Sequence, residues 1–412
     1  MQETMGEDFY LNAFRRGRLL DLTRNAARNS ATFNSILKSF DLHAIGTNGG
    51  KVILDLKDYD QALRIRDKFA EWTRNSDFFD GLSLNSTLRL ILKTYLIGGD
   101  TVLLYDDGLV EDSGKLLVYE PDEIANTSET ALKARYGRFA RQSLGRVYNG
   151  NGRWIGAIVS RSQRGMPEFD PSKSYLLKRD PDSSYFDNLW LMPRNVFRPA
   201  QGRGVSPASS VLASVLDLED LLKFELAAAK KNSQVVGTIV EESHDDTAAP
   251  SAFDGEVDFD GMTDEEIKAY AEAEAQAEKT VSLDVIKNYG AIYQTLPAGF
   301  KWEQIDTKHP NANMPDFIKF MAGRSASAFG LSQNFADFQV NGSDYEANMA
   351  FSKRTFEDAQ KFLEGVCDWL FYRWAKWEAK HGNDMGITPE IVTQSVSWEW
   401  PHANELDENA HA

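Results

Sequence analysis

The stretch FRPAQGRGVSPASSVLASVLDLEDLL, residues 197 to 222, contains the step that decides the fold, from irregular chain into a long helix. Two glycines, Gly202 and Gly204, flank an arginine. Glycine adopts backbone angles that are closed to other residues, so this pattern predicts a tight bend. Ser206 is a suitable helix N-cap, and Pro207 suits the first helical turn. The sequence therefore predicts a hinge that leads directly into a helix.

The helix that follows the hinge is expected to run from Pro207 to about Asn232. Its apolar residues recur at helical spacing and share one face. They are Val211, Val215, Leu218, Leu222, Leu226 and Ala229. Such a stripe is typical of an amphipathic helix.

Upstream of the hinge, the chain reads as helices followed by strands. Helical periodicity covers 14–46, 59–75 and 83–99, with Gly46 ending the first run and a Gly-Gly pair ending the last. Antiparallel pairs are expected in 100–121 and 145–161, the second around the turn Asn149 to Gly152. Further strands are expected in 173–180 and 188–199. We predict a helical part and then a β-rich module.

Downstream of the hinge helix, strands are expected at 235–240 and 290–305, on either side of an acidic stretch. An exposed helix is expected at 263–279, with Thr263 as its cap. A helix over 315–330 should end at Gly330, and a loop rich in amides should occupy 331–343. The last helix should run from Asp344 to about His381, roughly 55 Å at ~1.5 Å per residue, with Gly365 as a candidate kink.

Composition sets limits on the class of protein. The 412 residues are 42% hydrophobic and 11% aromatic, enough for substantial cores. Cys367 is the only cysteine, which excludes an intrachain disulfide and favours a reducing compartment. The first residues are polar and acidic, unlike a signal peptide, and no apolar run approaches the roughly 18 residues of a membrane span. We expect no membrane partner.

The charge is unevenly distributed. A net charge of −17 argues against a surface that grips nucleic acid by neutralising phosphates. It does not exclude a surface past which DNA slides. Arginines crowd residues 15–28, the segment 133–164 is basic, and the segment 241–284 is strongly acidic. Different regions are therefore expected to meet different partners, or one another.

Catalytic motifs are weak throughout. The chain has no GxxxxGK[ST] phosphate loop, and its six histidines show no HExxH or HxxxH spacing. Four acids could in principle hold Mg²⁺: Asp106, Asp107, Glu111 and Asp112. Acids beside a turn are ordinarily solvated turn formers, and that interpretation is favoured. Aromatic residues gather in 362–377, where packing of the last helix is favoured over a base-stacking platform. No catalytic residue, cofactor or metal site is predicted.

In combination, several segments have a familiar order. They are RRGRLLDLTRNAARNSATFNSIL followed by HAIG, LIGGDTVLL, PAQGRGVSPASSVL leading into LDLEDLLKFELAAAKKNS, GFKWEQIDTKHPNANMPDFIKFMAGRSASAFGLS, and GSDYEANMAFSKRTFEDAQ before a Trp-rich close. In this order and spacing, the chain resembles phage portal proteins of the lambda type. The acidic helix at 263–279 has no counterpart in that pattern, and relatives usually continue beyond the final WEWPHANELDENAHA.

The resemblance implies an α+β, portal-like fold with a helical N-terminal part, a β-rich wing, paired stem helices, a small α/β clip and a long C-terminal helix. In residues, the wing is 1–206, the first stem helix 207–232 and the clip 233–303. The second stem helix is 304–330, the tunnel loop 331–343, and the long helix with a short crown-like tail 344–412.

The resemblance also implies a function without catalysis. Family members form a ring, typically dodecameric, at one capsid vertex of the virion, assembled in the cytoplasm of the bacterial host. Double-stranded DNA passes through the ring non-specifically. The implied partners are the terminase large subunit, the major capsid protein and head-completion or tail adaptor proteins. Two alternatives remain open at this point: a metal-dependent nuclease or phosphatase using the acids at 106–112, and a capsid adaptor that never encloses DNA.

Candidate site residues follow from the same resemblance. The hinge of the family motif is formed by Gln201, Gly202, Arg203, Gly204 and Pro207. The DNA-channel candidates in the tunnel loop are the uncharged amides Gln333, Asn334, Gln339 and Asn341, which would contact phosphates weakly. Candidates for phosphate contact beside the loop are Lys319, Arg324, Lys353 and Arg354, with pairing to acids of a neighbouring subunit as the alternative. The acids of 241–284 are expected to discourage DNA from sticking in the channel.

Overall fold

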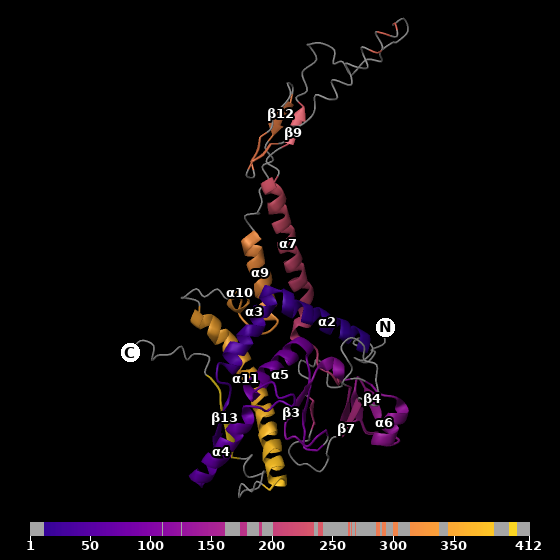
Figure 1. Ribbon diagram of the computed structural model, residues 1–412, viewed down its shortest axis with the longest axis vertical. Helices are drawn as coiled ribbons and strands as arrows, with labels where there is room; N and C mark the ends of the chain where they lie inside the picture. Colours follow the sequence, from indigo (N-terminus) through magenta and orange to yellow (C-terminus); the bar gives the residue numbers. More distant parts are fainter. Residues whose placement is uncertain are drawn as a thin grey trace, which may run out of the picture. The chain divides into compact units, whose positions relative to one another are not determined.

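A computed structural model gives the structure of the chain (Figure 1). It describes residues 12–108, 110–124, 126–160, 174–178, 189–191, 201–234, 238–241, 263, 265, 268, 286–288, 291–293, 300–303, 314–337, 345–382 and 395–401. The chain divides into two compact units. Unit 1 comprises residues 1–219 and 316–412, and unit 2 comprises residues 220–315.

Between residues 12 and 108, unit 1 contains four α-helices: α2 (Ala13–Asn29), α3 (Ala31–Phe40), α4 (Tyr59–Thr73) and α5 (Leu84–Gly98). The expected helix over 14–46 is broken at Ser30, whose extended backbone ends α2 and whose hydroxyl caps α3. A π-helical turn, η1 (Asp41–Ile45), completes α3 before Gly46, as predicted, ends the run. The apolar residues keep their helical spacing across Ser30. Periodicity alone therefore did not show that the segment divides into two helices.

The β-rich module contains two antiparallel sheets. One has the strand order β3 (Leu116–Tyr119), β2 (Val102–Tyr105), β8 (Leu189–Leu191). The other runs in sequence through β4 (Arg141–Ser143), β5 (Arg146–Tyr148), β6 (Trp154–Ser160) and β7 (Ser174–Lys178). Both predicted hairpins are confirmed. At the second turn, the Asn149 side chain accepts the N–H groups of Asn151 and Arg153, and Gly152 has a φ of +78°.

The two sheets share one core. Val102, Leu104 and Leu117 of the first sheet cluster with Ala157, Val159 and Leu177 of the second. The opposite face of the second sheet is covered by a helix that the sequence patterns did not predict, α6 (Glu129–Tyr136), through Leu132. With only eight residues, α6 is too short to produce a strong periodic signal.

The C-terminal part of unit 1 contains α9 (Met314–Ser327), the short α10 (Asn334–Asp337) and the 36-residue α11 (Tyr345–Lys380). α11 lies beside α5 (Figure 1) and carries the predicted aromatic packing: Trp369, Phe371 and Trp374 are fully buried. Gly365 lies inside α11 without interrupting it. The expected loop over 331–343 is wrong at α10, because Phe335 and Ala336 are buried in the main core and hold this turn against α3.

A strand pair joins distant parts of the chain. β1 (Lys51–Leu54) pairs antiparallel with β13 (Val396–Glu399), and Trp398 packs against Phe69 and Phe371. Neither strand was predicted, since four residues with an interrupted apolar pattern give little local signal.

Helix α7 (Leu212–Gln234) follows a short 3₁₀ turn, η3 (Pro207–Ser210), as the hinge sequence predicted. Unit 2 contains the later part of α7 and two antiparallel strand pairs. β9 (Thr238–Glu241) pairs with the distant β12 (Phe300–Glu303), and β10 (Ile286–Asn288) forms a hairpin with β11 (Ala291–Tyr293). The predicted strands on both sides of the acidic stretch are therefore present. The acidic helix expected at 263–279 lies outside the described residues, apart from three single positions.

Overall the fold is mixed α+β, mostly helical, with small antiparallel sheets. Within the described ranges, no helix is both long and apolar enough to cross a membrane.

Candidate functional site

The hinge at 201–207 is built around a buried ion pair. The guanidinium of Arg203 meets the carboxylate of Asp100 with two parallel contacts, Nε to Oδ2 at 2.5 Å and Nη2 to Oδ1 at 2.9 Å. Both side chains are almost completely buried, with 3% and 0% exposed. A two-pronged pair is the geometry in which arginine compensates best for lost hydration. Asp100 follows Gly99, the C-cap of α5, so the pair joins the end of α5 to the hinge.

Hydrogen bonds satisfy further polar groups around this pair. Arg203 also donates to the carbonyls of Pro121 (2.8 Å) and Leu144 (2.7 Å), and the Gly204 N–H donates to Asp100 at 2.9 Å. From α2, Arg16 donates to the Gly204 carbonyl at 2.7 Å. The hinge therefore gathers α2, α5 and the β-rich module around one buried ion pair.

The glycines act differently from the prediction. Neither Gly202 nor Gly204 has a positive φ, so the expected special bend angles are absent there. The left-handed residue is Gly99, with φ +86°, and a Cβ added to it would lie 2.3 Å from the Val205 carbonyl carbon. At Gly202, an added Cβ would lie 2.5 Å from the Tyr148 hydroxyl. At Gly202 the close neighbour is therefore the end of a side chain, whereas at Gly99 it is backbone.

The start of the helix confirms the capping prediction. The Ser206 hydroxyl accepts the Ala208 N–H at 3.1 Å and donates to the Leu96 carbonyl at 2.7 Å. Pro207 occupies the first helical turn. Beside them, the Gln201 side chain donates to the Arg203 carbonyl at 2.8 Å. One serine therefore connects the last turns of α5 to the start of η3.

The apolar stripe of α7 changes character along its length. Val211, Val215 and Leu218 are buried in the core of unit 1. From Leu222 onward the stripe is uncovered: Leu222 is 38% exposed and Leu226 56%. Within this single chain, the apolar face is buried only over the first two turns of the helix.

Of the four amides proposed as DNA contacts in the tunnel loop, the structure describes two. Gln333 is exposed just before α10, and Asn334 is half-buried as the first residue of that helix. Gln339 and Asn341 lie outside the described residues.

The four candidate phosphate contacts lie on two helices. Lys319 and Arg324 are exposed on α9, and Lys353 and Arg354 are exposed on α11. Lys353 has Glu357 one turn away at 3.7 Å. Among the described residues, the other three have no ion-pair partner within 4 Å.

Three of the four acids at 106–112, Asp106, Asp107 and Asp112, have structural partners. Burial tends to raise the pKa of Asp106, but hydrogen bonds from Ser113 and from the Val110 N–H outweigh it and hold the pKa below the ordinary value. Asp107 pairs with Arg373. Asp112 pairs with Lys380 at 2.9 Å, which lowers the pKa of Asp112. These three acids stabilise a turn and attach it to α11. Among the described residues, no group of three potential ligands is arranged to hold a metal.

The sequence patterns indicated Arg203 but not its partners. Asp100 carried a usable signal, an acid directly after the Gly98–Gly99 pair that ends a helix, yet nothing local indicated that it turns inward. Arg16 stood out only as one of several arginines in a basic opening helix.

Three chains in solved structures have a fold similar to that of this chain. A chain from the virion of a native gene transfer agent particle matches with a TM-score of 0.54 and 12% identity, covering 95% of this chain and 86% of that one. A chain from the neck of an empty gene transfer agent particle, computed with C6 symmetry, matches with a TM-score of 0.53 and 13% identity over 94% and 86%. A third chain, from the neck of the native gene transfer agent particle computed with C12 symmetry, matches with a TM-score of 0.50 and 12% identity. The match covers 94% of this chain and 86% of that one.

Comparison with curated proteins gives no match. The family model described as "Phage portal protein, lambda family" matches residues 11–360, most of the chain. The fold and this match define the class as phage portal proteins, structural components of phage-like particles without enzymatic activity. Within that class, the chain belongs to the lambda family.

Proposed function

We propose that the chain assembles into a closed ring whose central channel passes double-stranded DNA during packaging and ejection. The observation that supports this most strongly is the exposed part of α7. Leu222, Leu226 and Ala229 form one uncovered apolar face. Phe224, 72% exposed, points to the other side of the helix, about 160° from Leu226 at ~100° per residue.

Two opposed apolar faces favour a ring over a dimer. A two-fold dimer covers the same patch on both copies, so one face suffices. In a ring, each subunit contacts two neighbours through two different surfaces. A helix with one face for each neighbour fits that requirement.

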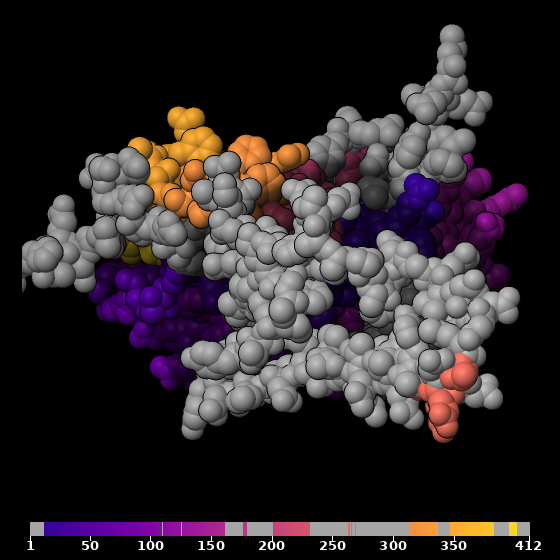
Figure 2. Space-filling model, turned by 90° about the horizontal axis from the view of Figure 1, so that it is seen from above, coloured from indigo at the N-terminus to yellow at the C-terminus, as the bar shows by residue number. Residues whose placement is uncertain are grey.

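Unit 1 supplies further uncovered apolar surface. Phe317 and Phe320 are exposed on α9, and Phe351 is exposed near the start of α11. Figure 2 shows both segments, in orange, at the surface. Large exposed aromatic residues are enriched where proteins meet other proteins, so α9 is a second candidate subunit contact.

The number of subunits we propose is twelve. The supporting fact is the C12 symmetry with which the similar neck of the native gene transfer agent particle was computed. In this proposal 1–206 is the wing, 207–232 and 304–330 are the stem helices, and 233–303 is the clip. The tunnel loop is 331–343, with the part after Asp337 as the best channel candidate because Phe335 and Ala336 are buried. The chain beyond 344 is the long helix with a crown-like tail.

The proposed partners follow from a ring at the capsid vertex of a phage-like particle: the terminase large subunit, the major capsid protein, and head-completion or tail adaptor proteins. We place Gln333, Asn334, Gln339 and Asn341 as weak DNA contacts. Lys319, Arg324, Lys353 and Arg354 are proposed as phosphate contacts near the channel.

The test is negative-stain electron microscopy of the purified chain together with mass determination on the same size-exclusion peak. We expect rings with a hole of roughly 20 Å or more, wide enough for a duplex, and a mass near twelve times 46.3 kDa. Solid particles, or a dimer that stays a dimer at high concentration, would overturn the proposal and favour an adaptor that does not enclose DNA.

A further inference from the structure

The β-rich module carries a charge opposite to that of the chain. From residue 130 to residue 167 there is no Asp or Glu, while eight positions are basic: Lys133, Arg135, Arg138, Arg141, Arg146, Arg153, Arg161 and Arg164. With −17 for the whole chain and +8 for this segment, the remaining residues carry −25. Such a segregated charge is a feature that core packing does not require.

The strand order gathers several of these charges at one end of the sheet. Arg141 at the start of β4 pairs with Tyr148 at the end of β5, and Arg153 directly precedes β6. Across β6, Lys178 at the end of β7 pairs with Gly156. Because neighbouring strands run in opposite directions, these three residues line one end of the sheet. Three spacings of ~4.8 Å make that end about 14 Å wide.

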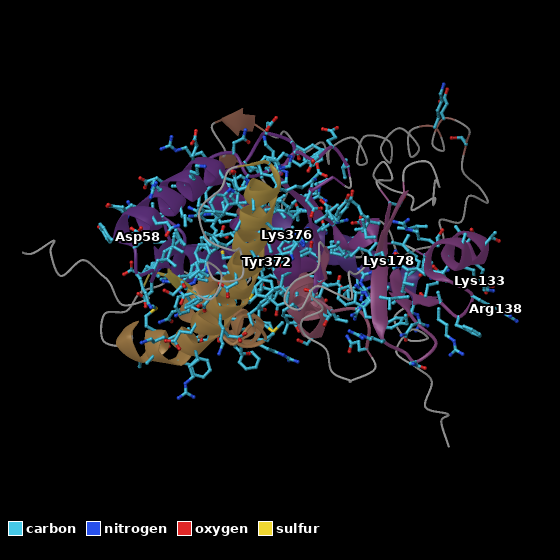
Figure 3. All side chains as sticks on the ribbon, turned by 90° about the horizontal axis from the view of Figure 1, so that it is seen from below. Asp58, Lys133, Arg138, Lys178, Tyr372 and Lys376 are labelled. Carbon is cyan, nitrogen blue, oxygen red and sulfur yellow. The ribbon has the colours of Figure 1, made fainter. Side chains whose placement is uncertain are left out.

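The turn before β4 adds to the same end. Arg138 lies over the ring of Phe139 at 5.8 Å. Phe139 is 73% exposed and lies against Gly150 of the β5–β6 turn. We call Arg138, Arg141, Arg153 and Lys178 the basic row. Lys133 and Arg135 lie on α6, in the same module. Figure 3 shows Lys133 and Arg138 together at one end of unit 1, with Lys178 between them and the α11 residues Tyr372 and Lys376.

The side chains of the basic row are available to a partner. All four are exposed, and none has an acid within ion-pair distance among the described residues. Arg146, by contrast, is used internally: it stacks on Tyr148 and Trp154 and donates to the Gly202 carbonyl. The row therefore differs from the arginines that hold the module together.

We propose that the basic row binds the phosphate backbone of double-stranded DNA, at a site separate from the channel candidates. Arginine forks match phosphate oxygens, and a duplex presents one charge per ~1.7 Å of axis. At ~0.1 M salt the screening length is about 10 Å, so distant acids of the chain weaken this attraction little. We choose DNA as the polyanion because of the proposed portal function. The charge and the exposure of the basic row are observations that do not depend on that function.

The experiment measures binding of a fluorescent 30-base-pair duplex to the full-length chain by anisotropy, over a range of NaCl concentrations. The test variant combines R138Q, R141Q and R153Q. The matched control combines K57Q, K68Q and R74Q, three exposed cations on and beside α4 with the same change in charge. Since each phosphate contact contributes about 0.9 to the slope of log K against log salt, the test variant should lower that slope by about 2 to 3 and weaken binding at least tenfold at ~0.1 M.

The possible results distinguish failure of the proposed DNA site from failure of the proposed ring. Equal losses in the two variants, or no binding by the wild-type chain at low salt, overturn the basic row while leaving the ring intact. If the test variant binds DNA normally but its rings dissociate in microscopy, the row pairs with acids of a neighbouring subunit, and the inference is also overturned. If the chain forms no ring but loses binding only in the test variant, the DNA site stands and the ring proposal fails.

Discussion

At the scale of the residue, Arg203 carries a full charge into the interior, where Asp100 meets it with both carboxylate oxygens. An ion pair of this kind is not a large net source of stability, because two charges lose their hydration. Removing one partner is costly, since it leaves the other charged and buried. The hinge therefore depends on the pair being complete.

Replacing Arg203 with alanine should lower the free energy of unfolding by about 3–5 kcal/mol. The measurement is thermal and urea unfolding of the purified variant. Arg18→Ala, an exposed arginine on α2, should change stability by no more than about 0.5 kcal/mol. Similar losses in both variants would show that the buried pair has no special role.

Gly99 is the residue whose conformation requires glycine. Gly99→Ala would force a side chain into a left-handed conformation and against the Val205 backbone, and should destabilise by at least about 2 kcal/mol. Gly17→Ala is the matched control: it lies inside α2 with open space around its Cβ, so it should stabilise by about 0.5–1 kcal/mol. The melting temperatures should shift in opposite directions, and a shift in the same direction contradicts the assignment.

At the scale of the element, the long α11 is held to the β1–β13 pair through Asp368, which accepts the Trp398 indole N–H at 2.7 Å. Burial raises the pKa of Asp368; the bond from Trp398 lowers it, and nearby Glu364 raises it. A raised folded-state pKa means that the native chain prefers the protonated acid. Stability therefore falls as pH rises from the ordinary value of 3.8 through the raised one.

Asp368→Asn keeps a carbonyl acceptor for Trp398 and removes the charge. It should raise the melting temperature at about pH 7, with the difference shrinking toward about pH 3, where the wild-type carboxyl is neutral as well. The check is a melting series between those two pH values, with exposed Asp55→Asn as the control. If the variant is less stable than wild type at neutral pH, the predicted direction of the stability change is wrong.

At the scale of the whole molecule, the exposed apolar surface on α7 would be covered by neighbouring subunits in the proposed ring. Leu226→Glu puts a charge on one of the two apolar faces and should shift the mass distribution from rings to smaller species. Ala227→Glu adds the same charge on the arc that carries Lys223 and Lys230, and rings should persist. Size exclusion with light scattering measures both, and intact rings in Leu226→Glu count against α7 as a subunit contact.

The sequence by itself determined the periodic elements. The stripe of α7, the turn at Asn149 to Gly152, the cap at Ser206 and the aromatic packing of α11 were all predictable, because each is specified by residues a few positions apart. The order of the motifs along the chain likewise indicated the family.

Only the tertiary structure decided the rest. The pairing of Arg203 with Asp100 spans 103 positions, and β1 pairs with β13 across most of the chain. Helix α10 forms where an amide-rich loop was expected, because Phe335 is buried in the core. The basic row exists because antiparallel strands bring their opposite ends together. In each case the physical reason is the same: a local pattern specifies the conformation of a segment, whereas its partners depend on which distant surfaces and charges the fold brings to it.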